Sequence, residues 1–161
     1  MFSKPDKFGI SFGFALMLIQ STCVMVSIFR RDESRPQNQS LGECVVLRLM
    51  DPYLNTGRNV TTDNSFTSIS FAKKLIEKRT STVGMVNKTR RDISATIKNA
   101  SLSLYETHIH NSETCTITVY QGKPYKSVMM LSSLHSNVFV DPEEAKKKHN
   151  TVKFYNATKF E

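Results

Sequence analysis

Hydrophobic positions along this chain fall into blocks whose spacing predicts both strands and helices. No residue from Phe8 to Phe29 carries a formal charge, and polar residues divide this stretch into two apolar runs, 8–18 and 23–29. Continuous apolar runs of this length are typical of buried strands. A membrane-spanning helix is the alternative, because about 20 apolar residues cross the hydrocarbon layer of a bilayer. The residues alone leave both interpretations open.

After a polar loop, apolar residues recur at helical spacing from position 41 onwards. Ser40 and Glu43 fit a capping box, in which the hydroxyl accepts one free N–H of the first turn and the carboxylate accepts another. Pro52 is expected to end this helix soon after Met50, because a residue that precedes proline avoids the helical conformation.

The next blocks alternate between strand and helix. Residues 58–62 read as a short strand that ends at Asp63, and residues 80–86 read as another strand. Between them, residues 68–78 predict an amphipathic helix with one apolar stripe. The stripe consists of Ile69, Ala72, Leu75 and Ile76. This order indicates an α/β layered core.

From position 101 the pattern changes to alternation of polar and apolar residues. Three strands are predicted within residues 101–133, with turns at 111–113 and 122–124. A charged loop and a short closing segment follow. His108 and His110 would share one face of the first of these strands, a spacing that could ligate zinc. We interpret them as exposed or core histidines, because no cysteine pair is near.

Composition and charge narrow the classes of partner. The chain has 161 residues, enough for one domain, and a formal net charge of +8. A basic balance favours nucleic acid or an anionic membrane. The three cysteines are widely spaced and predict neither a disulfide framework nor a metal knuckle. A reducing compartment, nucleus or cytoplasm, is therefore expected, with a membrane as the alternative if residues 8–29 form a helix.

The segment GRNVTTDNSFTSISFAKKLIEKRTSTVGMVNKTRRDIS, residues 57–94, resembles the central block of piggyBac-family transposases. Those proteins have a strand running into T-x-DN, an aromatic residue, FTS, a helix, a VG strand and a basic loop. Further blocks follow the family order, namely KPDKFGI (4–10), DESRP (32–36), LGE-x-VVLRLM-x-PYL (41–54), YQGKP (120–124), LSSLH (131–135) and FYNATK (154–159). The resemblance covers nearly the whole chain and is weakest over residues 11–31.

The resemblance implies an α/β fold, an incomplete ribonuclease H-like (retroviral integrase-like) core with a mostly β insertion. On this interpretation residues 1–100 form the partial core, residues 101–140 the β-rich insertion, and residues 141–161 a charged loop and C-terminal segment. An RNase H-like sheet without its final helix would leave apolar surface uncovered. We therefore expect self-association or association with a partner.

Family members cut and join DNA with three aspartates that hold two divalent ions, usually Mg²⁺. Asp63 corresponds to the second aspartate. Met17 stands at or beside the position of the first, and a thioether does not replace a carboxylate at Mg²⁺. The third should follow FYNATK by several residues, and Glu161 falls short of that position. Ser65 replaces the usual aromatic residue after DN. The resemblance thus implies a catalytically inactive transposase relative that uses no cofactor.

Weak and non-specific DNA binding is the remaining expectation. Lys88, Arg90 and Arg91, in the basic loop of the family block, are the candidate nucleic-acid-binding residues, because cationic side chains neutralise phosphates and release counterions. The secondary candidates are Lys98 and Lys146 to Lys148. A solvated basic loop is the alternative interpretation of the same residues.

Overall fold

The computed structural model describes residues 11–17, 23–29 and 40–158, so the KPDKFGI and DESRP blocks and Glu161 lie outside the described residues. The uncharged stretch forms two strands, β1 (Ser11–Met17) and β2 (Cys23–Phe29), paired antiparallel. The strand interpretation is thus the one observed. Within the described ranges, no helix has the length and apolarity needed to cross a membrane.

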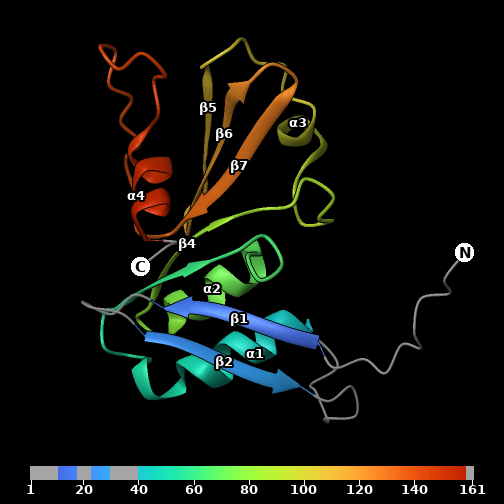
Figure 1. Cartoon of the computed structure of the whole chain (residues 1–161), viewed down its shortest axis with the longest axis vertical. Coiled ribbons are helices and arrows are strands. Elements are labelled where there is room, and N and C mark those ends of the chain that lie inside the picture. Colours follow the sequence, from blue (N-terminus) through green and yellow to red (C-terminus); the bar gives the residue numbers. More distant parts are fainter. Residues whose placement is uncertain (1–10, 18–22, 30–39, 159–161) are drawn as a thin grey trace, which may run out of the picture.

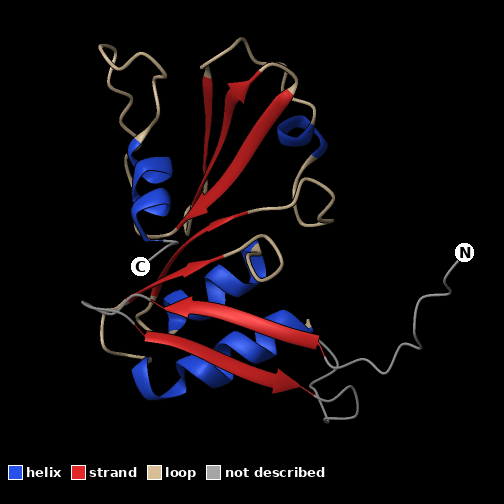
Figure 2. Ribbon diagram, viewed as in Figure 1, coloured by secondary structure: helices blue, strands red, loops and turns tan. Residues whose placement is uncertain are grey.

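A five-stranded mixed sheet forms the centre of the structure, with strand order β3-β4-β7-β6-β5. Its strands are β3 (Asn59–Thr62), β4 (Ser81–Met85), β5 (Thr107–Asn111), β6 (Thr116–Lys123) and β7 (Lys126–Ser132). Only β3 and β4 are parallel, and the other neighbours are antiparallel. Figures 1 and 2 show β5, β6 and β7 continuing the sheet beyond β4. The β-rich region predicted after position 100 therefore shares a sheet with the α/β part of the chain.

The predicted strand starting at 101 begins later, at Thr107. The residues before it form a turn, in which the backbone N–H of Ser103 donates to a carboxylate oxygen of Glu106 at 2.6 Å and the N–H of Glu106 donates to the Ser103 carbonyl at 3.1 Å. Tyr105 within this turn has a positive φ of 66°. A left-handed residue interrupts an extended strand, so the alternation in the sequence overstated its length.

The first predicted helix is α1 (Leu41–Met50), followed by a 3-10 turn, η1 (Asp51–Tyr53), that contains Pro52. Ser40 caps α1 by accepting the N–H of Glu43 at 3.2 Å. The other half of the predicted capping box is wrong. The Glu43 carboxylate points to another helix and accepts hydrogen bonds from Ser68, Ser70 and Lys74.

The second predicted helix is α2 (Ile69–Glu77), capped by Ser68, whose hydroxyl accepts the N–H of Phe71. Ala72 and Leu75 of the predicted stripe are fully buried, whereas Ile76 is exposed. Phe71, outside the predicted stripe, is fully buried instead, because α2 packs against α1 and β3 as well as against β6 and β7.

Helices cover both faces of the sheet. On one face, Ala72 of α2 and the segment that leads into α3 (Ala95–Lys98) pack on β6 and β7. On the other face, Val152 and Tyr155 of α4 (Asn150–Thr158) pack on β4, β6 and β7. Figure 1 shows α4 beside the sheet, and the β1–β2 pair below it, where β1 contacts β3 and both strands contact α1.

Candidate functional site

Asp63 follows β3 directly and begins a tight loop, residues 63–68, that we call the Asp63 loop. The carbonyl oxygen of Asp63 accepts hydrogen bonds from the N–H groups of Phe66 and Thr67, at 3.0 and 3.1 Å, and from the Thr67 hydroxyl at 2.9 Å. The Asp63 side chain is exposed. The backbone of this residue is therefore fixed while its carboxylate faces solvent.

The Asp63 loop is held against the sheet by a close approach at Gly84. The hydroxyls of Thr62 and Thr67 lie 2.8 Å apart, and Thr62 pairs with Gly84 of β4. A Cβ atom on Gly84 would lie 2.2 Å from the Thr67 hydroxyl and 2.6 Å from the Thr62 carbonyl oxygen. Gly84 of the VG strand and Thr67 of the FTS block are thus in contact. Only a residue without a side chain leaves room for this contact.

The same loop is held to α1 by Glu43, which is 4% exposed. One carboxylate oxygen accepts hydrogen bonds from Ser68 at 2.9 Å and Ser70 at 2.5 Å, and the other from Lys74 at 2.8 Å. Burial opposes ionisation of Glu43, but these hydrogen bonds and the Lys74 charge outweigh it and hold the pKa of Glu43 below its usual value. The LGE and FTS blocks, distant in sequence, therefore form one buried network.

The basic loop, residues 87–92, follows β4 and contacts the Asp63 loop. The Arg90 guanidinium donates to the Ser65 carbonyl at 3.3 Å, and the Asp92 carboxylate accepts the N–H of Ile69 at 3.0 Å. Asp92 thus adds a negative charge at the N-terminus of α2, where the helix dipole favours it. Ser65 is exposed.

The predicted nucleic-acid-binding residues differ in how exposed they are to solvent. Lys88 is half-buried and donates to the Ser127 hydroxyl on β7, and Arg90 is half-buried against Ser65. Arg91 is exposed. Of the secondary candidates, Lys98 and Lys148 are half-buried, and Lys146 and Lys147 are exposed in the loop before α4.

The end of α4 reaches β3 beside the Asp63 loop. The hydroxyls of Thr61 and Thr158 lie 3.0 Å apart. Burial and the nearby charge of Asp63 raise the pKa of Tyr155. No element type was predicted for this closing segment, although buried Val152 and Tyr155 are three residues apart, a helical spacing.

The described residues do not fit a two-metal site. Met17 is the last residue of β1, but its side chain is not among those described. Nowhere in the described ranges do three His, Cys, Asp or Glu side chains come together so that they could hold a metal ion. His108 pairs with Glu106 at 3.1 Å, and both are partly exposed.

Comparisons with known proteins agree with the arrangement of the blocks. The family model described as Transposase IS4 matches residues 1–160. A solved structure, the cryo-EM structure of a piggyBac transposase synaptic complex with hairpin DNA, matches with a TM-score of 0.74 and 31% sequence identity. The match covers 83% of this chain and 28% of that transposase. No curated protein matches the sequence.

The fold is thus that of the RNase H-like transposase core, as the family resemblance implied. Both the family model, which matches nearly the whole chain, and the solved structure are of transposases. The chain belongs to the Transposase IS4 family and is related to the piggyBac transposases.

Proposed function

We propose that this chain is a non-catalytic member of its family that binds DNA weakly and without sequence preference. The observation that carries the proposal is the contact between the basic loop, residues 87–92, and the Asp63 loop, made by Arg90 and Ser65. It brings cationic side chains to the strand end at which family members hold their second catalytic aspartate. The matched transposase was solved with hairpin DNA, which supports DNA as the ligand class.

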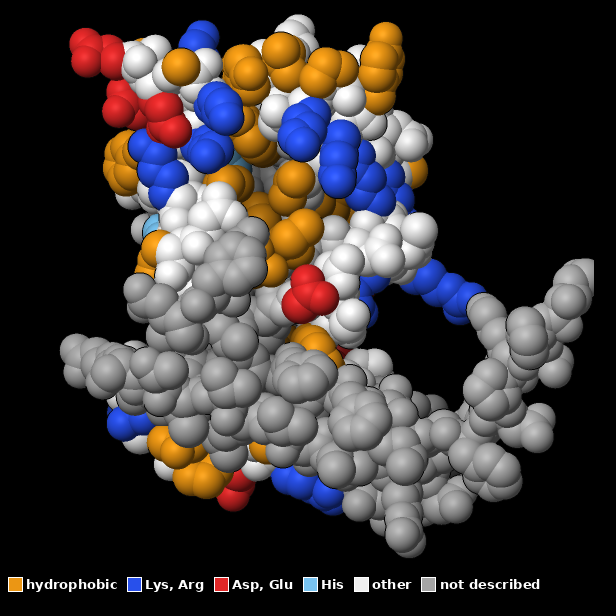
Figure 3. Space-filling model, viewed as in Figure 1, with side chains coloured by type: hydrophobic (Ala, Val, Ile, Leu, Met, Phe, Trp, Pro, Cys, Tyr) orange, Lys and Arg blue, Asp and Glu red, His pale blue; other side chains and the backbone are white. Residues whose placement is uncertain are grey.

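The charge distribution supports the same ligand. Figure 3 shows Lys and Arg side chains spread over the upper part of the visible face, with acidic side chains beside some of them at the upper left. Arg91 is the candidate for direct phosphate contact, because it is exposed. Arg90 instead holds the basic loop in place through the Ser65 carbonyl.

The absence of catalysis is proposed on chemical grounds. Two-metal strand transfer needs several carboxylates around a pair of cations, which stabilise the attacking and leaving oxygens. By counting from the family blocks, Met17 stands at or beside the position of the first aspartate, and hard cations such as Mg²⁺ select oxygen ligands over a thioether. Asp63 then acts as a surface carboxylate beside the basic loop.

The DNA-binding part is tested by fluorescence anisotropy with a labelled DNA hairpin over a series of salt concentrations. Log affinity should fall linearly with log salt, and Arg91→Ala should reduce the slope by about 0.9, the value for one phosphate contact on duplex DNA. Lys73→Ala removes an exposed cation from α2 and serves as the matched control. Salt-independent binding, or equal losses in both variants, would contradict the proposal.

The non-catalytic part is tested by titrating Mg²⁺ and Mn²⁺ calorimetrically into the chain and into Asp63→Ala, with cleavage of the same DNA hairpin assayed in parallel. We expect neither stoichiometric metal binding nor cleavage. Metal binding and cleavage that both disappear in Asp63→Ala would show that other acids complete the site and would overturn this part of the proposal.

A further inference from the structure

The tip of the β6–β7 hairpin holds a tyrosine in an unfavourable backbone conformation. Lys123 and Lys126 are paired across the turn, with Pro124 and Tyr125 between them. Tyr125 has a φ of 60°, in the left-handed region. Proline followed by a positive φ is the arrangement of a type II turn, which favours glycine or asparagine at the position of Tyr125. Its side chain is fully exposed, so packing does not compensate for the strain.

The two lysines that flank this tyrosine place two exposed positive charges opposite each other at the tip. Like charges directly opposite each other across a strand pair repel. Among the described residues neither Lys123 nor Lys126 forms an ion pair. An anionic group bound at the tip would neutralise this charge and relieve the repulsion.

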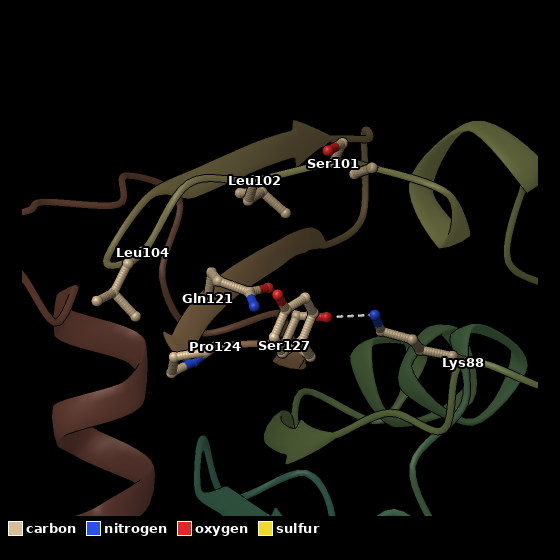
Figure 4. Close-up of a pocket in the computed structure, with 9 residues that line it drawn as sticks. Lys88, Ser101, Leu102, Leu104, Gln121, Pro124 and Ser127 are labelled. Carbon is tan, nitrogen blue, oxygen red and sulfur yellow. Dashed lines mark hydrogen bonds between the residues drawn. The ribbon is translucent and has the colours of Figure 1, made fainter.

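A cleft of about 510 Å³ opens beside the tip and includes Tyr125 in its lining. Figure 4 shows Lys88 extending to Ser127 from one side of this cleft, and Leu102 across from Gln121. The lining thus combines a cation, an amide and aliphatic side chains with the exposed aromatic ring. This mixture suits a ligand with a charged backbone and a flat heteroaromatic group.

We propose that the β6–β7 tip and this cleft bind an unpaired nucleotide of a DNA strand, with the base stacked on Tyr125 and the adjoining phosphates near Lys123 and Lys126. The proposal rests on the DNA binding proposed above and adds a preference for unpaired bases. Aromatic side chains that stack on bases within a cationic groove are how proteins bind single strands. In a duplex both faces of a base are covered by neighbouring bases, so Tyr125 has no free face to stack on.

The test compares anisotropy of a labelled single-stranded oligothymidine with that of a duplex of equal length. Tyr125→Ala should weaken single-strand binding about tenfold, the size expected for one lost stack, and leave duplex binding unchanged within twofold. Tyr125→Phe keeps the ring and should bind like the wild type. Phe139→Ala removes another exposed aromatic side chain, on the loop before α4, and should change neither affinity. Circular dichroism confirms that each variant is folded.

The outcomes separate this inference from the proposed function. If Tyr125→Ala leaves both duplex and single-strand binding unchanged, or reduces both equally, the stacking site is wrong. The general DNA binding proposed above would then still hold. No binding to either DNA would overturn both proposals. Polyglutamate at matched charge should compete poorly against the single strand, and equal competition would show a general polyanion surface with no base stacking.

Discussion

Gly84 and Thr67 are in contact so close that a methyl group on Gly84 would lie 2.2 Å from the Thr67 hydroxyl. The same methyl group would lie 2.6 Å from the Thr62 carbonyl oxygen, a backbone atom that cannot rotate away. The backbone of β4 therefore determines how closely the Asp63 loop approaches the sheet.

Gly84→Ala is expected to destabilise the protein by about 2 kcal/mol or more, because overpacking a dense interior forces backbone shifts. The measurement is urea denaturation followed by circular dichroism. A Thr67→Ser substitution in the Gly84→Ala background keeps the hydroxyl and removes a methyl group, and it should restore little, since the Thr62 carbonyl still clashes. Wild-type stability of Gly84→Ala would disprove the close contact.

Glu43→Ala should lower the free energy of unfolding by about 2 kcal/mol, because it leaves the hydroxyls of Ser68 and Ser70 without their acceptor. Glu43→Gln keeps an acceptor oxygen and should cost less. The lowered pKa of Glu43 means that its ionised form stabilises the fold above the unfolded pKa near 4.5, and that this contribution is lost as pH falls below it toward the folded value. Glu43→Gln should therefore remove that part of the acid sensitivity in pH-dependent urea titrations. An unchanged acid profile would count against an ionised Glu43.

A second acid sensitivity is expected at higher pH, from His149. This residue is fully buried, its ring contacts Tyr120 edge-on at 6.0 Å, and neither ring nitrogen has a partner within the described residues. Burial first, and the nearby His135 charge second, lower the pKa of His149 from 6.5 to about 4. The unfolded chain therefore binds a proton that the folded chain does not, and stability should fall by at most about 3 kcal/mol as pH drops from 6.5 to 4.

His149→Phe keeps an aromatic ring against Tyr120 and has no titrating nitrogen. The difference between wild type and His149→Phe in denaturation midpoint should grow as pH falls from 6.5 to 4. A constant difference over this range would mean that His149 keeps an ordinary pKa. His135, half-buried with a pKa also lowered by burial, remains in both proteins, so the acid sensitivity that arises from its own burial is present in each.

Thr61→Val is expected to loosen the end of α4. The Thr158 hydroxyl also lies 2.9 Å from the Phe154 carbonyl and donates to it, so Thr61 is the donor in the Thr61–Thr158 pair. Valine has the same shape without the hydroxyl, and we expect a loss of about 1 kcal/mol and faster amide hydrogen exchange in α4. Thr89→Val, at an exposed position in the basic loop, is the control. Equal exchange rates in α4 would indicate that packing of Val152 and Tyr155 alone holds the helix.

Local patterns were sufficient to predict most elements of the fold. The Ser40 cap, the end of α1 near Pro52 and the strands on either side of α2 follow from signals within a few residues. Alternation alone did not reveal the turn around Tyr105, in which Glu106 accepts the N–H of Ser103 and the N–H of Tyr105 donates to the Gln121 carbonyl.

Contacts between distant segments could not be predicted in the same way. The Glu43 carboxylate fits a local capping box by sequence, but three donors on α2 and its cap compete for it and bind it instead. Arg90 was predicted to contact DNA because of its charge, and its bond to the Ser65 carbonyl depends on a fold that no local pattern encodes. The role of Asp63 came from the family block, and the predicted DNA contacts remain predictions.

The sheet order also determines when the structure can form during synthesis. β4 pairs with β3 through the short α2 crossover, but its other edge pairs with β7, which is made much later. At a ribosome adding about 5 to 20 residues per second, that edge of β4 stays open for seconds while the intervening segment emerges. Open strand edges recruit other chains, so the nascent protein should need a chaperone most in the interval between synthesis of β4 and docking of β7.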